Sequence, residues 1–294
     1  MKTVRFLGVC LSLVIIVGLL AGCGTSGQST GDNKAKENGE QGKYADGIYF
    51  AKQDQYDESS GWKGIVTLEV KDGKIVRADW NALSIKGGDD KKTASKNGSY
   101  GMKAKGNASA EWHEQAEKVE AYLLETQDPT KIEYSDNEGH TDAISGATIH
   151  VSEFFELAKK ALDNGPLTKG PYKDGFYHAE AKDFDESSGW KGTVDIAVVG
   201  GRIVDANWNA VHKDGGDDKK TASKNGSYGM KAKGNASAEW HEQAEKVEAY
   251  LLETQDPAKI EYSDNEGHTD AISGATIHVN EFFELAQEAL AQAK

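Results

Sequence analysis

Apolar and polar residues alternate in the same order twice along the chain. Residues 47–52 form a short, largely apolar run, and residues 64–71 alternate between apolar and polar, which predicts two strands. Asp72-Gly73 is typical of a type I′ hairpin turn, so residues 74–81 are expected to return as a third strand. Gly200-Gly201 keeps the hairpin turn in the second half of the chain.

A helical period follows these strands. Residues 86–107 are rich in Gly, Lys, Asp and Asn and predict a loop. Residues 109–126 carry apolar side chains at helical spacing, and Asp128-Pro129 is expected to stop this helix. The predicted apolar face consists of Trp112, Ala116, Val119 and Leu123. A last helix is expected from near Thr148 or Ser152 to Leu162. Strands and helices are segregated along the chain, which predicts an α+β fold with a hairpin-based antiparallel sheet and two main helices.

The whole pattern is a tandem duplication with a constant offset of 128 residues and no gap. Residues 87–151 differ from residues 215–279 only at Thr130, which is Ala258 in the second copy. We therefore expect a first domain over residues 44–162 and a second over residues 172–294. Residues 163–171 contain two Pro and two Gly and are expected to form a linker.

The N-terminal residues predict export and lipid anchoring. Lys2 and Arg5 precede an apolar stretch that is too short to span a membrane, so residues 1–22 are interpreted as a signal peptide. Residues 20–23, Leu-Ala-Gly-Cys, resemble the lipobox of bacterial lipoproteins, which implies a diacylglycerol anchor on Cys23. Residues 23–43 contain almost no large apolar side chain and predict a flexible tether.

Composition excludes several classes of function. Of the two cysteines, Cys10 lies in the predicted signal peptide, so the mature chain has no pair for a disulfide and no ligand set for an iron–sulfur cluster. The formal net charge of −14 makes a nucleic-acid partner unexpected, because such proteins need a basic surface. Neither a dinucleotide fingerprint nor a phosphate-binding P-loop occurs in the sequence.

The ten residues 142–151 recur without change as residues 270–279. Within them, Asp142-Ala-Ile-Ser145-Gly146-Ala147-Thr148 places a hydroxyl among small neighbours where the last helix is expected to begin. A helix N-terminus favours phosphate, so Thr148 is a candidate carrier of a phosphate ester. The alternative is that Ser145 or Thr148 only caps the helix.

This seven-residue pattern resembles the flavinylation motif of FMN-binding domains in the C subunit of sodium-pumping quinone reductase and the G subunit of the Rnf complex. The resemblance covers residues 44–162 and 172–290. It implies that a flavin transferase, using FAD and magnesium, attaches one FMN through its phosphate to Thr148 and another to Thr276. The remaining motif residues that it implies are Asp142, Ser145, Gly146, Ala147, Asp270, Ser273, Gly274 and Ala275.

Two such domains behind a lipobox resemble the pheromone-type flavin lipoproteins of extracellular electron transfer in Gram-positive bacteria. The resemblance implies a carrier on the outer face of the cell membrane. It would receive electrons from a membrane NADH dehydrogenase and quinone pool and pass them to ferric iron or soluble flavins. Direct ferric reductase activity stays open, as does a different function: a lipoprotein that binds a ligand or cell-wall component without redox chemistry.

Other repeated residues are candidates for contact with a flavin ring, each with a simpler alternative. Trp62 and Trp190 would either stack on the ring or pack over the hairpin. Tyr100, Met102, Tyr228 and Met230 would either flank the ring or lie in a solvated loop, and the same holds for the lysines at 103, 105, 231 and 233. The histidines at 113, 140 and 150 and their copies match no metal-binding spacing, so no metal site is expected.

Overall fold

The computed structural model describes residues 43–294, which belong to one compact unit. The predicted signal peptide, Cys23 and nearly all of the predicted tether lie outside these residues. No helix within the described part of the chain is long and apolar enough to cross a membrane.

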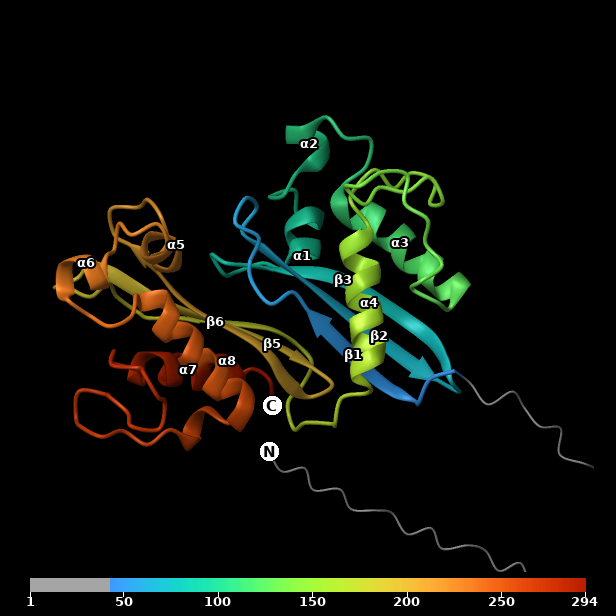
Figure 1. Ribbon diagram of the computed structural model, residues 1–294. Helices are drawn as coiled ribbons and strands as arrows, with labels where there is room; N and C mark the ends of the chain where they lie inside the picture. The colour runs from blue at the N-terminus through green and yellow to red at the C-terminus, as the bar shows by residue number, and fades with distance from the viewer. Residues whose placement is uncertain (1–42) are drawn as a thin grey trace, which may run out of the picture. The chain divides into compact units, whose positions relative to one another are not determined.

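The fold is mixed α+β, with two three-stranded antiparallel sheets that are each followed by helices (Figure 1). The strands of the first sheet are β1 (Gly47–Lys52), β2 (Trp62–Lys71) and β3 (Lys74–Ser84), in the order β1-β2-β3. Those of the second are β4 (Gly175–Glu180), β5 (Trp190–Val199) and β6 (Arg202–His212), in the order β4-β5-β6. The predicted fold class is therefore confirmed at the level of the elements.

The hairpin turns are those that the sequence predicts. Asp72 and Gly73 have φ angles of 52° and 70°, and Gly200 and Gly201 have φ angles of 60° and 76°. Two consecutive positive φ angles are the requirement of a type I′ turn, which matches the twist of the paired strands. The returning strand β3 is longer than predicted, because its pairing with β2 continues to Trp62 opposite Ser84.

Each sheet is followed by two short helices and two long ones. In the first repeat these are α1 (Lys91–Lys96), α2 (Met102–Gly106), α3 (Trp112–Thr126) and α4 (Ser152–Asn164). In the second they are α5 (Lys219–Lys224), α6 (Met230–Gly234), α7 (Trp240–Thr254) and α8 (Asn280–Ala291), with a 3₁₀ turn at Pro257–Lys259. The prediction that residues 86–107 form only a loop was wrong, since α1 and α2 lie within them. The Asp90 carboxylate starts α1 by accepting the Thr93 N–H.

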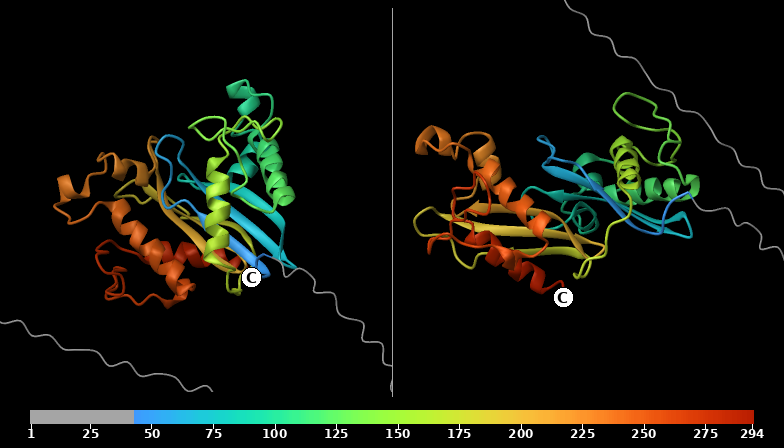
Figure 2. Two further views of the ribbon diagram at one scale, coloured as in Figure 1. Left: turned by 45° about the vertical axis from the view of Figure 1, so that its right-hand side comes forward. Right: turned by 60° about the horizontal axis from the view of Figure 1, so that its bottom comes forward.

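The long helices cover one face of their own sheet. Helix α3 packs on β3, and α4 packs on β1 and β2 (Figure 2). The predicted apolar face of α3 is confirmed, because all four of its side chains are buried. Phe154, Phe155 and Ala158 of α4 are buried in the same core, while Leu162 is only partly buried.

The opposite face of the first sheet contacts the second repeat. Phe50 and Ile65 form a small buried cluster with Val199 of β5. The segment that joins the repeats is pinned to both: the Leu167 N–H donates to the Ile48 carbonyl, and the Gly170 N–H donates to the Gly200 carbonyl. A side chain at Gly170 would collide with the Gly201 backbone, so the close approach requires glycine. Residues 163 and 164 of the predicted linker belong to α4.

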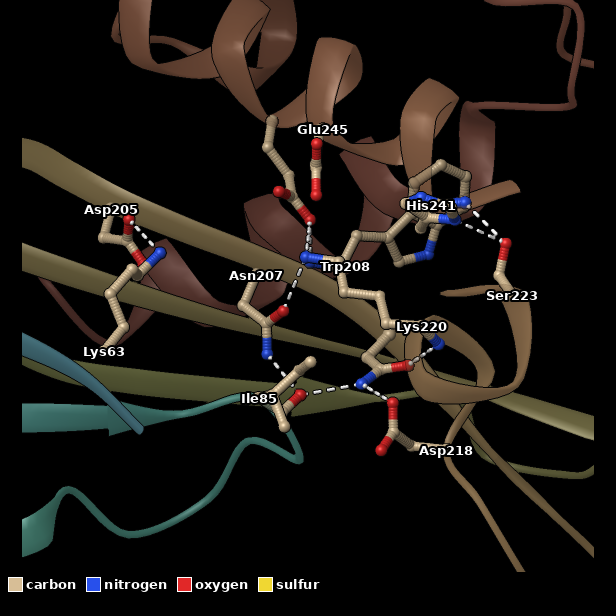
Figure 3. Close-up of polar contacts among 12 residues, drawn as sticks. Lys63, Ile85, Asp205, Asn207, Trp208, Asp218, Lys220, Ser223, His241 and Glu245 are labelled. Carbon is tan, nitrogen blue, oxygen red and sulfur yellow. Dashed lines mark hydrogen bonds and ion pairs between the residues drawn. The ribbon is translucent and has the colours of Figure 1, made fainter. Parts of the chain in front are cut away.

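Polar contacts between the repeats surround Asp205, which is 2% exposed. Its carboxylate accepts from Lys52 Nζ at 2.5 Å and Lys63 Nζ at 2.8 Å, both from the first sheet (Figure 3). The Asn207 side-chain amide donates to the Ile85 carbonyl at 3.0 Å, again across the repeats. Two lysines from one repeat therefore neutralise one buried carboxylate of the other.

Candidate functional site

The repeated motif forms a tight loop in front of α4. Ile144 is buried and anchors the loop, and its carbonyl accepts the Ala147 N–H. Gly146 has a φ angle of 77°, which glycine adopts without strain. Thr148 therefore lies on a defined backbone and is an exposed residue.

A buried glutamine holds this threonine in place. Gln115 of α3 is fully buried, and its Oε1 atom accepts both the Thr148 N–H, at 2.7 Å, and the Thr148 hydroxyl, at 3.1 Å. Gln243 holds Thr276 in the same way, at 2.7 and 3.2 Å. The sequence analysis did not identify either glutamine.

Of the two predicted starts of the last helix, Ser152 is confirmed and Thr148 is wrong. Helix α4 begins at Ser152 with Val151 as its N-cap residue, and no side chain caps it. Thr148 lies one turn earlier, so the N-terminus of α4 does not present its N–H groups at this hydroxyl in the way we expected. The alternative that Ser145 or Thr148 serves as the helix cap is wrong for the same reason. Lys118 of α3 contacts the loop, because its Nζ atom donates to the Gly146 carbonyl at 3.4 Å.

In the second repeat, four of the predicted residues meet around one cavity of about 490 Å³. Trp190, Tyr228, Met230 and Thr276 all line it, although 86 residues of chain separate the first of them from the last. The other lining residues that carry the argument below are Asp185, Trp208, Lys219, Trp240 and Glu281. The walls thus combine three tryptophans and a tyrosine with one ammonium and two carboxylates.

Lys219 lies in an aromatic cage within this cavity. Its Nζ atom is 5.9 Å from the ring centroid of Trp190, 5.2 Å from that of Tyr228 and 4.6 Å from that of Trp240. Burial lowers the pKa of Lys219 to about 8, and the attraction of Glu281 and Asp185 offsets only part of this effect. The cage therefore holds an amine that changes its charge close to neutral pH.

The Glu281 carboxylate fits in the cavity because the residue next to it, Gly192, has no side chain. A side chain at Gly192 would collide with the Glu281 carboxylate, and a side chain at Gly64 would collide with that of Glu153. Burial raises the pKa of Glu281. In the first repeat, Trp80 Nε1 donates to Glu153 at 3.1 Å, which fixes the tryptophan ring and the carboxylate together.

The first repeat assembles the same set of residues. Trp62 packs edge-on against Tyr100 with ring centroids 5.9 Å apart, and Lys91 Nζ lies 4.8 Å from the Trp112 ring. Among the positions that line the cavity in the second repeat, only Asn280 has a different counterpart, Ser152. Burial lowers the pKa of Lys91, as it does for Lys219.

The candidate lysines of the second repeat, Lys231 and Lys233, do not line the cavity. Lys105 and Lys233 donate to the backbone carbonyls of Ser99 and Ser227, and Lys231 pairs with Glu242. Asp142 and Asp270 are exposed at the start of their motif loops. In the second repeat, the cavity lining does not include Asp270, Ser273, Gly274 or Ala275.

Comparisons with known proteins give similarity without a function. No family model and no curated protein matches the chain. A solution structure of a protein from Clostridium thermocellum is 68% identical over 41% of this chain and 91% of its own length, with a TM-score of 0.34. A crystal structure of a protein from Clostridium perfringens is 28% identical over 42% of this chain and 89% of its own, with a TM-score of 0.33.

Proposed function

We propose that the protein is an extracellular electron carrier with one FMN attached through its phosphate to Thr148 and a second to Thr276. The observation that carries the proposal is the position of Thr276, an exposed residue that lines a cavity walled by aromatic side chains. A hydroxyl that serves only as a structural contact would not need such a cavity beside it.

The residues present fit a flavin. A volume of about 490 Å³ lies within the range of roughly 300–1,000 Å³ that small-molecule sites occupy. Trp190, Trp240 and Tyr228 offer faces and edges for a flat ring system, and Met230 adds a polarizable contact. Lys219 provides a cation inside the cavity, where hydrogen bonds to an electron-rich ring are strongest. FMN bound here would supply the redox chemistry, because it accepts one or two electrons.

The rest of the proposal rests on the sequence. A lipid on Cys23 would hold the protein at the outer face of the membrane, close to a donor fed by a membrane NADH dehydrogenase and quinone pool. Ferric iron or free flavins would be the acceptors. A covalent bond suits this location, because a dissociable cofactor would be lost by dilution outside the cell.

The test is to measure the intact mass and visible absorbance of the full chain co-produced with a flavin transferase. We expect two FMN adducts on the unaltered chain, one on Thr148→Val, one on Thr276→Val and none on the double variant. Thr130→Ala is the matched control, because the second repeat already has alanine at the equivalent position. This variant should keep both adducts.

An unmodified, colourless chain would contradict the proposal if the same transferase labels a control protein in parallel. The cavity would then be assigned to a small ligand that binds without redox chemistry, which is the alternative left open by the sequence.

A further inference from the structure

A second cluster of functional groups lies where the motif loop contacts the segment that precedes it. Glu138, His140 and His150 each offer a ligand atom, and these atoms lie within 4.8 Å of one another. The two imidazole rings are 4.3 Å apart, and His150 Nε2 lies 3.7 Å from a carboxylate oxygen of Glu138. Glu266, His268 and His278 repeat the arrangement.

Local hydrogen bonds pre-form this cluster. The Asp136 carboxylate accepts the N–H groups of Glu138 and His140 and also bonds the His140 ring at Nδ1, at 2.5 Å. Because Nδ1 is bonded to Asp136, the Nε2 atom of His140 is the ring nitrogen that can coordinate a metal ion. A carboxylate behind a ligating histidine is the usual outer partner in metal sites, because it fixes the ring and its tautomer.

The backbone brings the second histidine to the first. The Val151 N–H donates to the Gly139 carbonyl, so the residue after His150 is joined to the residue before His140. Gly139 has a φ angle of 87°, and a side chain there would collide with Ser152. Glycine at 139 therefore permits the approach that sequence spacing alone does not reveal.

We propose that each motif loop binds one divalent first-row transition-metal ion through two histidines and one glutamate. Two imidazoles and one carboxylate form the three-ligand set of open zinc sites, and the same set suits iron(II). Magnesium and calcium prefer sites made of oxygen ligands alone, so they are poor occupants. The remaining coordination positions face solvent, since the His150 side chain is 61% exposed and that of Glu138 is 74% exposed.

This inference goes beyond the proposed flavin function and does not depend on it. His150 lies two residues after Thr148, and His278 lines the cavity with Thr276, so a bound ion would sit beside each attachment residue. The ligands nevertheless belong to the protein alone and are available without any flavin.

The test is calorimetric titration of the full-length Thr148→Val/Thr276→Val chain with zinc chloride, since this chain carries no flavin adduct. We expect two ions per chain, one ion for His150→Ala and none when His278→Ala is added. His140→Ala should likewise remove one ion. His113→Gln is the matched control, because His113 bonds Ser95 outside the cluster and its loss should leave both ions bound.

Magnesium chloride in place of zinc should give no saturable binding. The proposal is overturned if the double histidine variant still binds two zinc ions, or if zinc binds no more tightly than magnesium. Because the His150 ring is largely exposed, its variant should fold, and an unchanged unfolding midpoint verifies this. The mass measurement of flavin attachment is separate, so either proposal can fail alone.

Discussion

At the scale of single residues, burial strongly perturbs the charge of Lys219 in the cavity. Its pKa is about 8 in the fold, against 10.5 for an exposed lysine. Below pH 8 the amine is charged in both the folded and unfolded states, so burial of the charge lowers the free energy of unfolding by its full amount. Between pH 8 and 10.5 the unfolded chain binds a proton that the folded chain does not, so stability rises with pH.

We therefore expect the free energy of unfolding of the native chain to gain up to about 3 kcal/mol from this group between pH 8 and 10.5. Lys219→Met should lose that gain and be more stable than the native chain at pH 7. Urea unfolding of both chains across this pH range measures the difference. Lys231→Met removes a half-exposed lysine outside the cavity and is the control, so its unfolding free energy should rise with pH as that of the native chain does. If the unfolding free energies of the native chain and Lys219→Met change with pH in the same way, the lowered pKa of Lys219 is refuted.

The residues of the cavity divide into those that the sequence reveals and those that only the fold reveals. Trp190, Tyr228 and Met230 were predicted because they are unusual residues beside Gly-rich, polar segments. Lys219 and Glu281 were not, because they stand among many other charged residues of the same types. What distinguishes them is burial against aromatic rings and against Gly192, which depends on contacts between distant segments.

At the scale of elements, the connection between α3 and the motif loop depends on Gln115. Replacing it with leucine removes the acceptor of the Thr148 N–H, and a partly buried hydrogen bond of this kind contributes roughly 0.5–1.5 kcal/mol to stability. We expect Gln115→Leu to lower the unfolding free energy by about that amount and to speed hydrogen exchange at the Thr148 amide. The Thr276 amide, held by Gln243, serves as the control within the same chain and should exchange at its native rate. Unchanged exchange at Thr148 would show that the loop does not need Gln115.

The long elements were predicted well, because their periodic burial is visible in the sequence. The alternation in β2 and the helical face of α3 each place apolar side chains on one core. Helices α1 and α2 were missed, because they are short and rich in Lys, and they are stabilised by contacts with distant segments. Asp90 caps α1 while also accepting a hydrogen bond from Asn81 of β3, a pairing that no local pattern encodes.

At the scale of the whole described chain, sequence differences between the repeats coincide with the contact between them. The residue type differs at three equivalent positions: Thr67 corresponds to Asp195, Arg77 to Asp205 and Asp79 to Asn207. Asp195 accepts the Gly88 N–H, Asp205 pairs with two lysines, and Asn207 donates to Ile85, all across the repeats. The cavity residues, by contrast, are nearly identical in both copies. The two sheets therefore differ where each repeat faces the other, while the candidate sites stay alike.

Asp205 is the residue through which this contact can be tested. Burial alone would raise its pKa, but the ammonium groups of Lys63 and Lys52 outweigh burial and lower it. The stabilisation is therefore present above the ordinary carboxyl pKa of 3.8 and is lost as pH falls through the lower folded value. At pH 7, Asp205→Ala leaves Lys63 buried without a partner, which costs about 3–5 kcal/mol.

We expect calorimetry at pH 7 to show a lower unfolding temperature for Asp205→Ala, and a partial return when Lys63→Met is added, because the second change removes the unpaired charge. Arg77→Ala is the matched control, since it alters the equivalent position of the first repeat, is exposed, and should change stability by less than about 0.5 kcal/mol. If Asp205→Ala is no less stable than Arg77→Ala, the ion pairs between the repeats do not hold them together. The repeats would then be joined mainly by Phe50, Ile65 and the segment around Gly170.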